Sequence, residues 1–259
     1  MILTYKGISI SYSVSGQGKT VTLLHGFLEN STMWKDAVTL LEKNHQVITI
    51  DLLGHGNTNC LGYVHTMEDF ADAINAVLTH LNITNTTLIG HSLGGYVALA
   101  YAEIKPHTIE GLCLMNSTPF ADSQERILLR NRAIKVAKSN YENLVSMSIS
   151  NLFFEDNRLR FDKEIESIKT EALKTPLQGY VATQEGMKIR VDRTKILENL
   201  NCKKLIIAGK NDPILSKMDL QHLETLNGIN IVILDGGHMS HIENKEEFLQ
   251  EIMRFNEKI

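Results

Sequence analysis

The sequence predicts one α/β domain with an eight-stranded, mostly parallel sheet, helices on both faces and a helical insertion. Apolar runs alternate with amphipathic helical segments along most of the chain, a pattern typical of a parallel sheet covered on both faces. The chain has 259 residues, 43% of them hydrophobic and 22% charged, which is enough for one large core in an ordinary globular protein.

Eight segments have the composition and length of strands. The first two alternate between apolar and polar residues on either side of Gly7, which predicts a hairpin. The others are short apolar runs of the kind found in buried parallel strands. The predicted strands are residues 2–5, 9–14, 21–24, 47–50, 87–89, 111–115, 205–208 and 230–234.

The helices between these strands can be predicted from their ends and apolar stripes. Thr66 and Asp69 have the spacing of a capping box before an apolar stripe, which predicts a helix that begins there. Residues 93–104 are rich in Gly and Ala, as expected of a helix packed closely on a central strand. A final amphipathic helix is predicted from Lys245 onward.

One region interrupts the alternation of strands and helices. About 85 residues separate the sixth and seventh predicted strands, too many for an unstructured connection in a compact domain. The region contains helical stretches, such as residues 126–137. We therefore expect a core of residues 1–117 and 203–259 with a helical cap of residues 118–202. An independent second domain is disfavoured because the same sheet pattern resumes afterwards.

Charge and composition exclude several classes of protein. A formal net charge of −4 without a basic block argues against nucleic acid as a partner. No apolar stretch has the length of a membrane span or a signal peptide, and the three cysteines are scattered, so we expect a cytoplasmic protein without disulfides. No zinc-ligand spacing or dinucleotide fingerprint occurs, so no metal or cofactor is predicted. The oligomeric state is left open.

The segment that indicates chemistry is Gly90-His91-Ser92-Leu93-Gly94, between a predicted strand and a predicted helix. This is the G-x-S-x-G nucleophile elbow in its strand–turn–helix context. Glycines on either side let the turn close, and the serine hydroxyl is then exposed above the sheet. The alternative, a phosphate-binding turn, is disfavoured because no G-x-x-x-x-G-K-[ST] pattern is present.

With this motif the chain resembles the α/β-hydrolase fold superfamily, in its cap-bearing esterase and meta-cleavage-product hydrolase branch. The resemblance runs from the first strand to the last helix and is weakest in the predicted cap. It implies a catalytic triad in the order nucleophile, acid, histidine. Serine at the nucleophile position argues against the haloalkane dehalogenases and most epoxide hydrolases of this fold, which use aspartate.

The resemblance places the other two members of the triad. His238 follows the last strand, where the family has its histidine; His241 is the alternative, and we expect it beside the site or on the surface. Asp212 follows the seventh strand and matches the family's acid, which would fix the tautomer of the imidazole. Asp122 and Asp235 remain as alternative acids, the first because some relatives carry the acid after the sixth strand.

The resemblance also implies an oxyanion hole of two backbone N–H groups. One belongs to Leu93, the residue after the nucleophile. The other is assigned to Phe27 in the short His25-Gly26-Phe27 loop, and His25 itself is interpreted as a structural imidazole. The turn that begins at Asp51 resembles another family signature with a structural role.

We therefore predict a serine hydrolase that cleaves carboxylic esters through an acyl-enzyme, with a small-molecule ester or related carbonyl compound as substrate. Candidate pocket residues, besides those of the oxyanion hole, suggest a partly apolar substrate: Leu28, Trp34, Phe120, Met147, Phe153 and Phe154.

Three alternatives use the same scaffold. One is a carbon–carbon bond hydrolase of the meta-cleavage type. Another is a lyase similar to the menaquinone-pathway enzyme, disfavoured because Tyr96 stands where that enzyme's pattern has arginine. The third is a ligand receptor built on a hydrolase fold.

Overall fold

A computed structural model describes all residues, 1–259, and contains one eight-stranded sheet in the order β1-β2-β4-β3-β5-β6-β7-β8. The pairings β1–β2 and β2–β4 are antiparallel, and all others are parallel. All eight predicted strands are confirmed, several of them one or two residues longer at an end. The strands are β1 (Ile2–Tyr5), β2 (Ile8–Ser15), β3 (Lys19–Leu24), β4 (His45–Ile50), β5 (Thr86–His91), β6 (Ile109–Met115), β7 (Lys203–Gly209) and β8 (Asn230–Leu234).

The strand order determines where a ligand can bind. The chain passes from β3 to β4 on one side and later returns to β5 on the other side of β3. In open parallel sheets, the loops at the carboxyl ends of such strands diverge and leave a crevice between them. The segments 25–30 and 91–95 leave β3 and β5 at this point.

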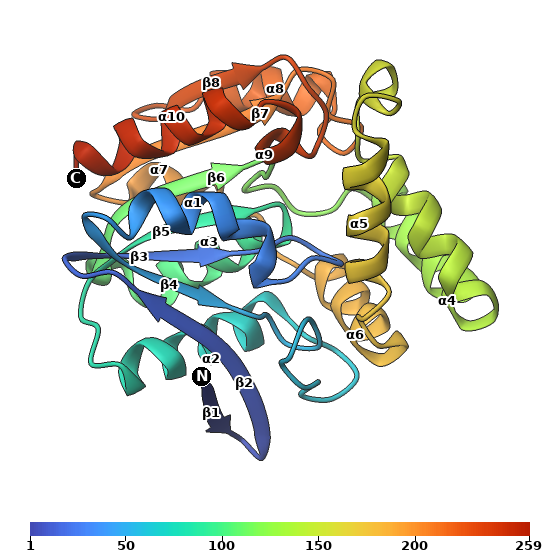
Figure 1. The fold of residues 1–259 in the computed structure, drawn as a ribbon, viewed down its shortest axis with the longest axis horizontal. Coiled ribbons are helices and arrows are strands. Elements are labelled where there is room, and N and C mark those ends of the chain that lie inside the picture. The colour runs from blue at the N-terminus through green and yellow to red at the C-terminus, as the bar shows by residue number, and fades with distance from the viewer.

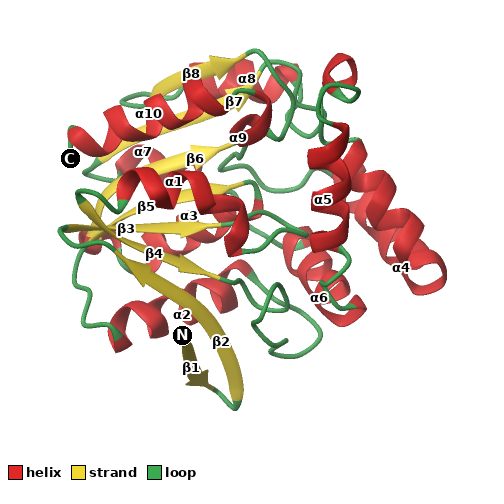
Figure 2. Cartoon of the chain, in the orientation of Figure 1, coloured by secondary structure: helices red, strands yellow, loops and turns green.

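Helices cover both faces of the sheet, as predicted (Figure 2). One face packs against α1 and α10 around an apolar cluster that includes Trp34 and Phe248. The other packs against α2, α3, α7 and α8 around a larger cluster that includes Phe70. The helices of the core are η1 (Ser31–Trp34), α1 (Lys35–Leu41), α2 (Met67–His80), α3 (Leu93–Ile104), η2 (Pro106–Thr108), α7 (Thr194–Asn199), α8 (Lys217–Glu224), α9 (Ser240–Glu243) and α10 (Lys245–Glu257).

Three predicted helix starts are confirmed. Thr66 and Asp69 form the capping box of α2, with each side chain accepting a hydrogen bond from the other residue's backbone N–H at 3.0 Å. Helix α3 begins at Leu93, and α10 begins at Lys245. None of the helices combines the length and apolar character that a bilayer crossing requires.

The segment between β6 and β7 is helical, as expected. It contains α4 (Gln124–Ser150), η3 (Glu155–Asn157), α5 (Asp162–Ala172) and α6 (Leu177–Lys188) before α7. Helices α4, α5 and α6 stand together beyond the carboxyl ends of the parallel strands (Figure 1). Helix α4 is kinked at Asn140, whose backbone is not helical. Unlike α4, α5 and α6, helix α7 packs on the sheet: Leu197, and Leu200 just after the helix, belong to the main core cluster.

Candidate active site

Ser92 lies on the predicted elbow between β5 and α3. Its backbone has φ 49° and ψ −110°, a conformation that residues with a side chain rarely adopt and that is common at functional sites. A Cβ on Gly90 would collide with the carbonyl of Gly94, and a Cβ on Gly94 with the carbonyl of Leu24. The two glycines therefore allow both the sharp turn and its close approach to the loop after β3. Ser92 itself is only half-buried.

His238 and Asp212 form a buried pair at the same end of the sheet. The ring Nδ1 of His238 lies 2.7 Å from Oδ2 of Asp212, and both side chains are almost completely buried. Because an ionised carboxylate can only accept, Nδ1 carries a proton, and in the neutral ring Nε2 then keeps its lone pair. This is the tautomer that a general base needs.

Both carboxylate oxygens of Asp212 are occupied. Oδ2 also accepts from the side-chain amide of Asn116 at 2.9 Å, and Oδ1 accepts from the backbone N–H groups of Ile214 and Leu215 at 2.7 and 3.2 Å. Burial alone would raise the pKa of Asp212. The charge and hydrogen bond of His238, with the donors from Asn116 and Ile214, more than offset burial and hold the pKa below its ordinary value. Asp212 is therefore ionised at neutral pH.

Hydrogen bonds connect the segments that carry these three residues. The backbone N–H of Ser92 donates to the carbonyl of Met115, and the Ser117 hydroxyl donates to the carbonyl of Ser92 at 2.8 Å. Asn116 donates to the carbonyl of Gly237 as well as to Asp212. The loops after β5, β6, β7 and β8 are thus joined. The Ser92 hydroxyl makes no hydrogen bond to His238 in this structure; such bonds often form only when substrate is bound.

The alternative acids and base from the sequence lie in other environments. Asp122 pairs with Arg130 and Arg190, and Asp235 is exposed, 3.8 Å from the ammonium of Lys210. Neither carboxylate contacts His238. His241 is buried rather than on the surface, and its Nε2 lies 3.9 Å from a carboxylate oxygen of Glu29.

The loop after β3 is held in place by buried polar contacts. His25 accepts a hydrogen bond from the backbone N–H of Leu52 through Nε2 at 2.9 Å, so both of its ring nitrogens have structural partners. Leu28 has φ 64°, the left-handed conformation that residues with a side chain rarely adopt. The ring of Phe27 packs against those of His55 and Tyr180. The start of α3 approaches this loop closely, because a Cβ on Gly94 would collide with the backbone carbonyls of Leu24 and His25.

The turn after β4 has the structural role expected for it. Asp51 accepts hydrogen bonds from the backbone N–H groups of Ser31 and Asn57 at 2.8 and 2.9 Å. It therefore ties η1 to this turn.

The predicted pocket residues are not brought together. Trp34 belongs to the core cluster between the sheet and α1 and α10, and Phe153 to a separate buried cluster with Ile165 and Met239. Met147 is 66% exposed on α4. An apolar side chain is expected to be buried, but the sequence does not show against which part of the protein it packs. The sequence could therefore not show that these three residues lie in different places.

The other three pocket candidates lie in three different environments. Leu28 is buried beside the helices of the insertion, and Phe120 stacks on the ring of His222. Phe154 contributes a backbone N–H to Glu243 at 3.1 Å. Of the six candidates, Leu28 lies next to the predicted oxyanion loop in the chain.

A cleft of about 700 Å³ lies between the core and α5. Residues of η1, α1, α9 and α10 line it, together with Leu28, Glu29 and His241. Ser92, Asp212 and His238 are not among its lining residues, so this cleft reaches the predicted oxyanion loop but not the elbow.

Four residues beside the site were not predicted from the sequence. Asn116 contacts Asp212 as described, and Glu243 accepts from the backbone of Gly237 and from the side chain of Asn157. Glu29 and His91 form a second buried carboxylate–imidazole pair. The motif around Ser92 includes His91, but nothing in the sequence connected it with Glu29.

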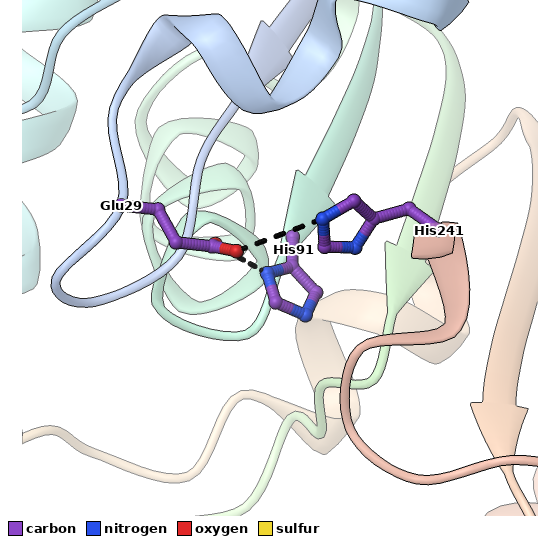
Figure 3. Close-up of side chains that lie close together, drawn as sticks. All are labelled: Glu29, His91 and His241. Carbon is purple, nitrogen blue, oxygen red and sulfur yellow. Dashed lines mark hydrogen bonds and ion pairs between the residues drawn. The ribbon is translucent and has the colours of Figure 1, made fainter. Parts of the chain in front are cut away.

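Glu29, His91 and His241 are also close enough to be considered as metal ligands. Their candidate ligand atoms all lie within 4.8 Å of one another, and all three residues are buried. Figure 3 shows the carboxylate of Glu29 facing the two imidazoles, which lie next to each other.

The fold and this geometry agree with the comparisons with known proteins. The sequence model of the alpha/beta hydrolase fold family matches residues 19–245, so the chain belongs to this family. A thermophilic esterase from Thermogutta terrifontis, solved with malate bound, superposes with a TM-score of 0.91 at 30% identity, covering 99% of this chain and 96% of that chain.

Two lactonases are similar at lower identity. The 3-oxoadipate enol-lactonase 1 of Acinetobacter baylyi is 23% identical over 262 residues, covering 100% of this chain and 97% of the relative. The enol-lactonase of Burkholderia xenovorans LB400 shares the fold with a TM-score of 0.90 at 22% identity, covering 98% of this chain and 99% of that chain. Together with the esterase, these relatives identify the chain as a hydrolase enzyme.

Proposed function

We propose that this chain is a serine hydrolase that cleaves carboxylic esters of small, partly apolar substrates through an acyl-enzyme. The observation that carries the proposal is the buried pair of His238 and Asp212, which the β8 and β7 loops bring to the end of the sheet where Ser92 stands on its strained turn.

In the first half of the reaction, Ser92 Oγ attacks the ester carbonyl carbon while His238 Nε2 takes the hydroxyl proton. The carbonyl π electrons move to the oxygen, where the N–H groups of Leu93 and Phe27 stabilise the negative charge. The C–O bond to the alcohol then breaks, and the leaving oxygen takes the proton from His238. Asp212 stabilises the imidazolium throughout.

In the second half, water attacks the acyl-enzyme and gives a proton to His238. The resulting tetrahedral intermediate collapses, and Ser92 Oγ leaves with that proton. The carboxylic acid is released, and the serine hydroxyl and neutral imidazole are restored.

Substrate selection is assigned to the insertion. Residues 118–202 act as a cap over a core of residues 1–117 and 203–259, since α4, α5 and α6 stand beyond the carboxyl ends of the strands (Figure 1). Leu28 packs with cap residues such as Val145 and Ile149, so the cap and the oxyanion loop share an apolar contact. This contact supports an apolar group on the substrate.

Lactones belong among the substrates to be tested. The A. baylyi and B. xenovorans relatives are named as enol-lactonases, and a lactone is a cyclic ester that the same attack by Ser92 would open. A cytoplasmic location, predicted from the sequence, is part of this proposal.

The test is hydrolysis of p-nitrophenyl acetate, p-nitrophenyl butyrate and an enol-lactone by the wild type and Ser92→Ala. We expect the wild type to turn over at least one of the three and Ser92→Ala to lose at least 10³-fold in kcat. Ser139→Ala, an exposed serine on α4, is the matched control and should match the wild type. Equal rates in Ser92→Ala and the wild type would refute the proposal. Activity on dienone acids alone would indicate carbon–carbon cleavage, and labelling by a fluorophosphonate without turnover would indicate a receptor.

A further inference from the structure

A second carboxylate–imidazole pair lies directly behind the elbow. His91 precedes Ser92 at the end of β5, and Glu29 belongs to the loop after β3 (Figure 3). Oε2 of Glu29 lies 2.6 Å from Nδ1 of His91, and both side chains are nearly inaccessible to solvent. The mechanism above uses neither residue.

This pair connects three loops of the site. The same Oε2 of Glu29 accepts a hydrogen bond from the backbone N–H of Gly26, in the predicted oxyanion loop, at 2.7 Å. The other ring nitrogen of His91, Nε2, lies 3.0 Å from the backbone carbonyl of His238. One carboxylate and one imidazole therefore join the oxyanion loop, the nucleophile elbow and the loop of the base.

The contacts of His91 determine its protonation. A backbone carbonyl can only accept, so Nε2 must donate to His238. A carboxylate that already accepts from Gly26 also requires a donor, so Nδ1 carries a proton as well. His91 with both nitrogens protonated is an imidazolium, and its charge balances that of Glu29.

The charges around the pair favour this state. Burial alone would lower the pKa of His91, but the charge and hydrogen bond of Glu29 raise the pKa above its ordinary value. Burial alone would raise the pKa of Glu29, but the charge and hydrogen bond of His91 lower it to about 2. The remaining titratable groups that face the pair are His25, His238, His241 and Asp212. Burial lowers the pKa of His25 and His241, which leaves both neutral.

We propose that Glu29 and His91 are positioning residues. As a buried carboxylate–imidazolium pair they hold the Gly26-Phe27 loop and the His238 loop in fixed positions relative to Ser92. This inference rests on the proposed serine hydrolase function. It explains why position 26 is glycine, since a Cβ there would collide with Oε2 of Glu29 and lie 2.7 Å from Nδ1 of His91.

A hydrogen-bonded pair accounts for the geometry better than a metal site does. The 2.6 Å between Nδ1 and Oε2 indicates a short, charge-assisted hydrogen bond, since such N–H···O bonds are shorter than neutral ones. Oε2 already accepts hydrogen bonds from Gly26 and His91, so a metal ion between His91 and Glu29 would have to displace the imidazole proton. His241 makes no hydrogen bond to Glu29 across its 3.9 Å separation, and we assign it no part in the pair.

Glu29→Gln is the diagnostic change because an amide cannot satisfy both neighbours. If the amide oxygen takes the place of Oε2, it accepts from Gly26, but His91 loses the charge that keeps both of its nitrogens protonated. If the amide nitrogen takes that place, its hydrogens face the N–H of Gly26. Either orientation loosens the oxyanion loop or the loop of His238.

The experiment compares the kinetics of the wild type, Glu29→Gln and His241→Gln on whichever ester the wild type hydrolyses. We expect Glu29→Gln to lose about 10- to 100-fold in kcat with KM nearly unchanged, less than the loss of an oxyanion donor outright. His241→Gln, which changes a buried neighbour of the same carboxylate, should stay within about threefold of the wild type. Wild-type kinetics in Glu29→Gln, or an equal loss in both variants, would overturn the proposal.

Nitrogen-15 NMR of the histidine rings supplies a readout that does not depend on activity. In the wild type at pH 7.5, both ring nitrogens of His91 should show the shifts of protonated nitrogens, and one should become unprotonated in Glu29→Gln. A neutral His91 in the wild type, or a stoichiometric metal ion measured by mass spectrometry in the purified protein, would refute the assignment. A wild type with no hydrolytic activity but a charged His91 would instead refute the proposed function and leave the pair intact.

Discussion

Replacing Asp212 with Asn tests the electrostatic part of the site, because the surroundings of this carboxylate predict the outcome. Four hydrogen-bond donors converge on two oxygens. His238 and Asn116 donate to Oδ2, and the N–H groups of Ile214 and Leu215 donate to Oδ1. An asparagine side chain offers one oxygen and one NH₂ group in the same space, so no orientation of the amide accepts all four bonds.

Either orientation of the amide has a cost. With the NH₂ group toward His238, the imidazole must accept at Nδ1 and carry its proton on Nε2, the tautomer that cannot take a proton from Ser92. This should reduce kcat about 10³- to 10⁴-fold, or about 4 to 5.5 kcal/mol at about 1.4 kcal/mol per tenfold. With the NH₂ group toward Ile214 and Leu215, two N–H groups lose their acceptor, and the buried one of Leu215 alone should cost about 1–3 kcal/mol of stability.

The assay measures kcat for the best ester at pH 8 together with urea unfolding of the same preparations. Asp235→Asn is the matched control because that carboxylate is exposed and pairs only with Lys210. It should change neither quantity. An Asp212→Asn enzyme that keeps a tenth or more of the wild-type kcat would show that this carboxylate does not fix the tautomer of His238.

Three other predictions follow from the same structure. His238→Ala should abolish turnover while His241→Ala retains most of it, as measured by ester hydrolysis; the reverse result would assign the base to His241. Gly94→Ala should lower kcat at least tenfold, because its Cβ would collide with the carbonyl of Leu24 and displace the oxyanion loop; unchanged kinetics would contradict this contact. The free energy of unfolding, measured by urea titration, should fall from pH 6.5 to pH 5, by up to about 1.4 kcal/mol per pH unit for each histidine that is neutral when folded but protonated when unfolded. A flat or rising profile would contradict the burial of the four histidines whose pKa burial lowers: His25, His55, His65 and His241.

The sheet and the elbow could be predicted from the sequence because each has a local signal. Parallel strands are short apolar runs, and the glycines around Ser92 reflect the steric demands of one turn. The predicted helix starts at Thr66 and Lys245 are confirmed for the same reason, since capping residues and apolar stripes act within a few residues. The pairing of His238 with Asp212 could be predicted only from the family resemblance, and in the structure Nδ1 of His238 lies 2.7 Å from Oδ2 of Asp212.

The surroundings of the site could not be predicted, because they depend on contacts between distant segments. Glu29 and His91 are 62 positions apart, and Asn116 and Asp212 are 96 apart, so no local pattern connects them. The pocket candidates show the same limit. Met147 is predicted to line the pocket because it is apolar, but it is 66% exposed on α4. The sequence pattern of the insertion does not reveal which side of its helices faces the core.

In the proposed reaction, Ser92 carries the acyl group during turnover. The most direct measurement is mass spectrometry of the protein after reaction with a fluorophosphonate, followed by peptide mapping, in the wild type and in Ser92→Ala. We expect one adduct per chain on the peptide that contains Ser92, and none in the variant. An adduct on any other residue, or a wild type that stays unlabelled while hydrolysing ester, would contradict the proposed reaction.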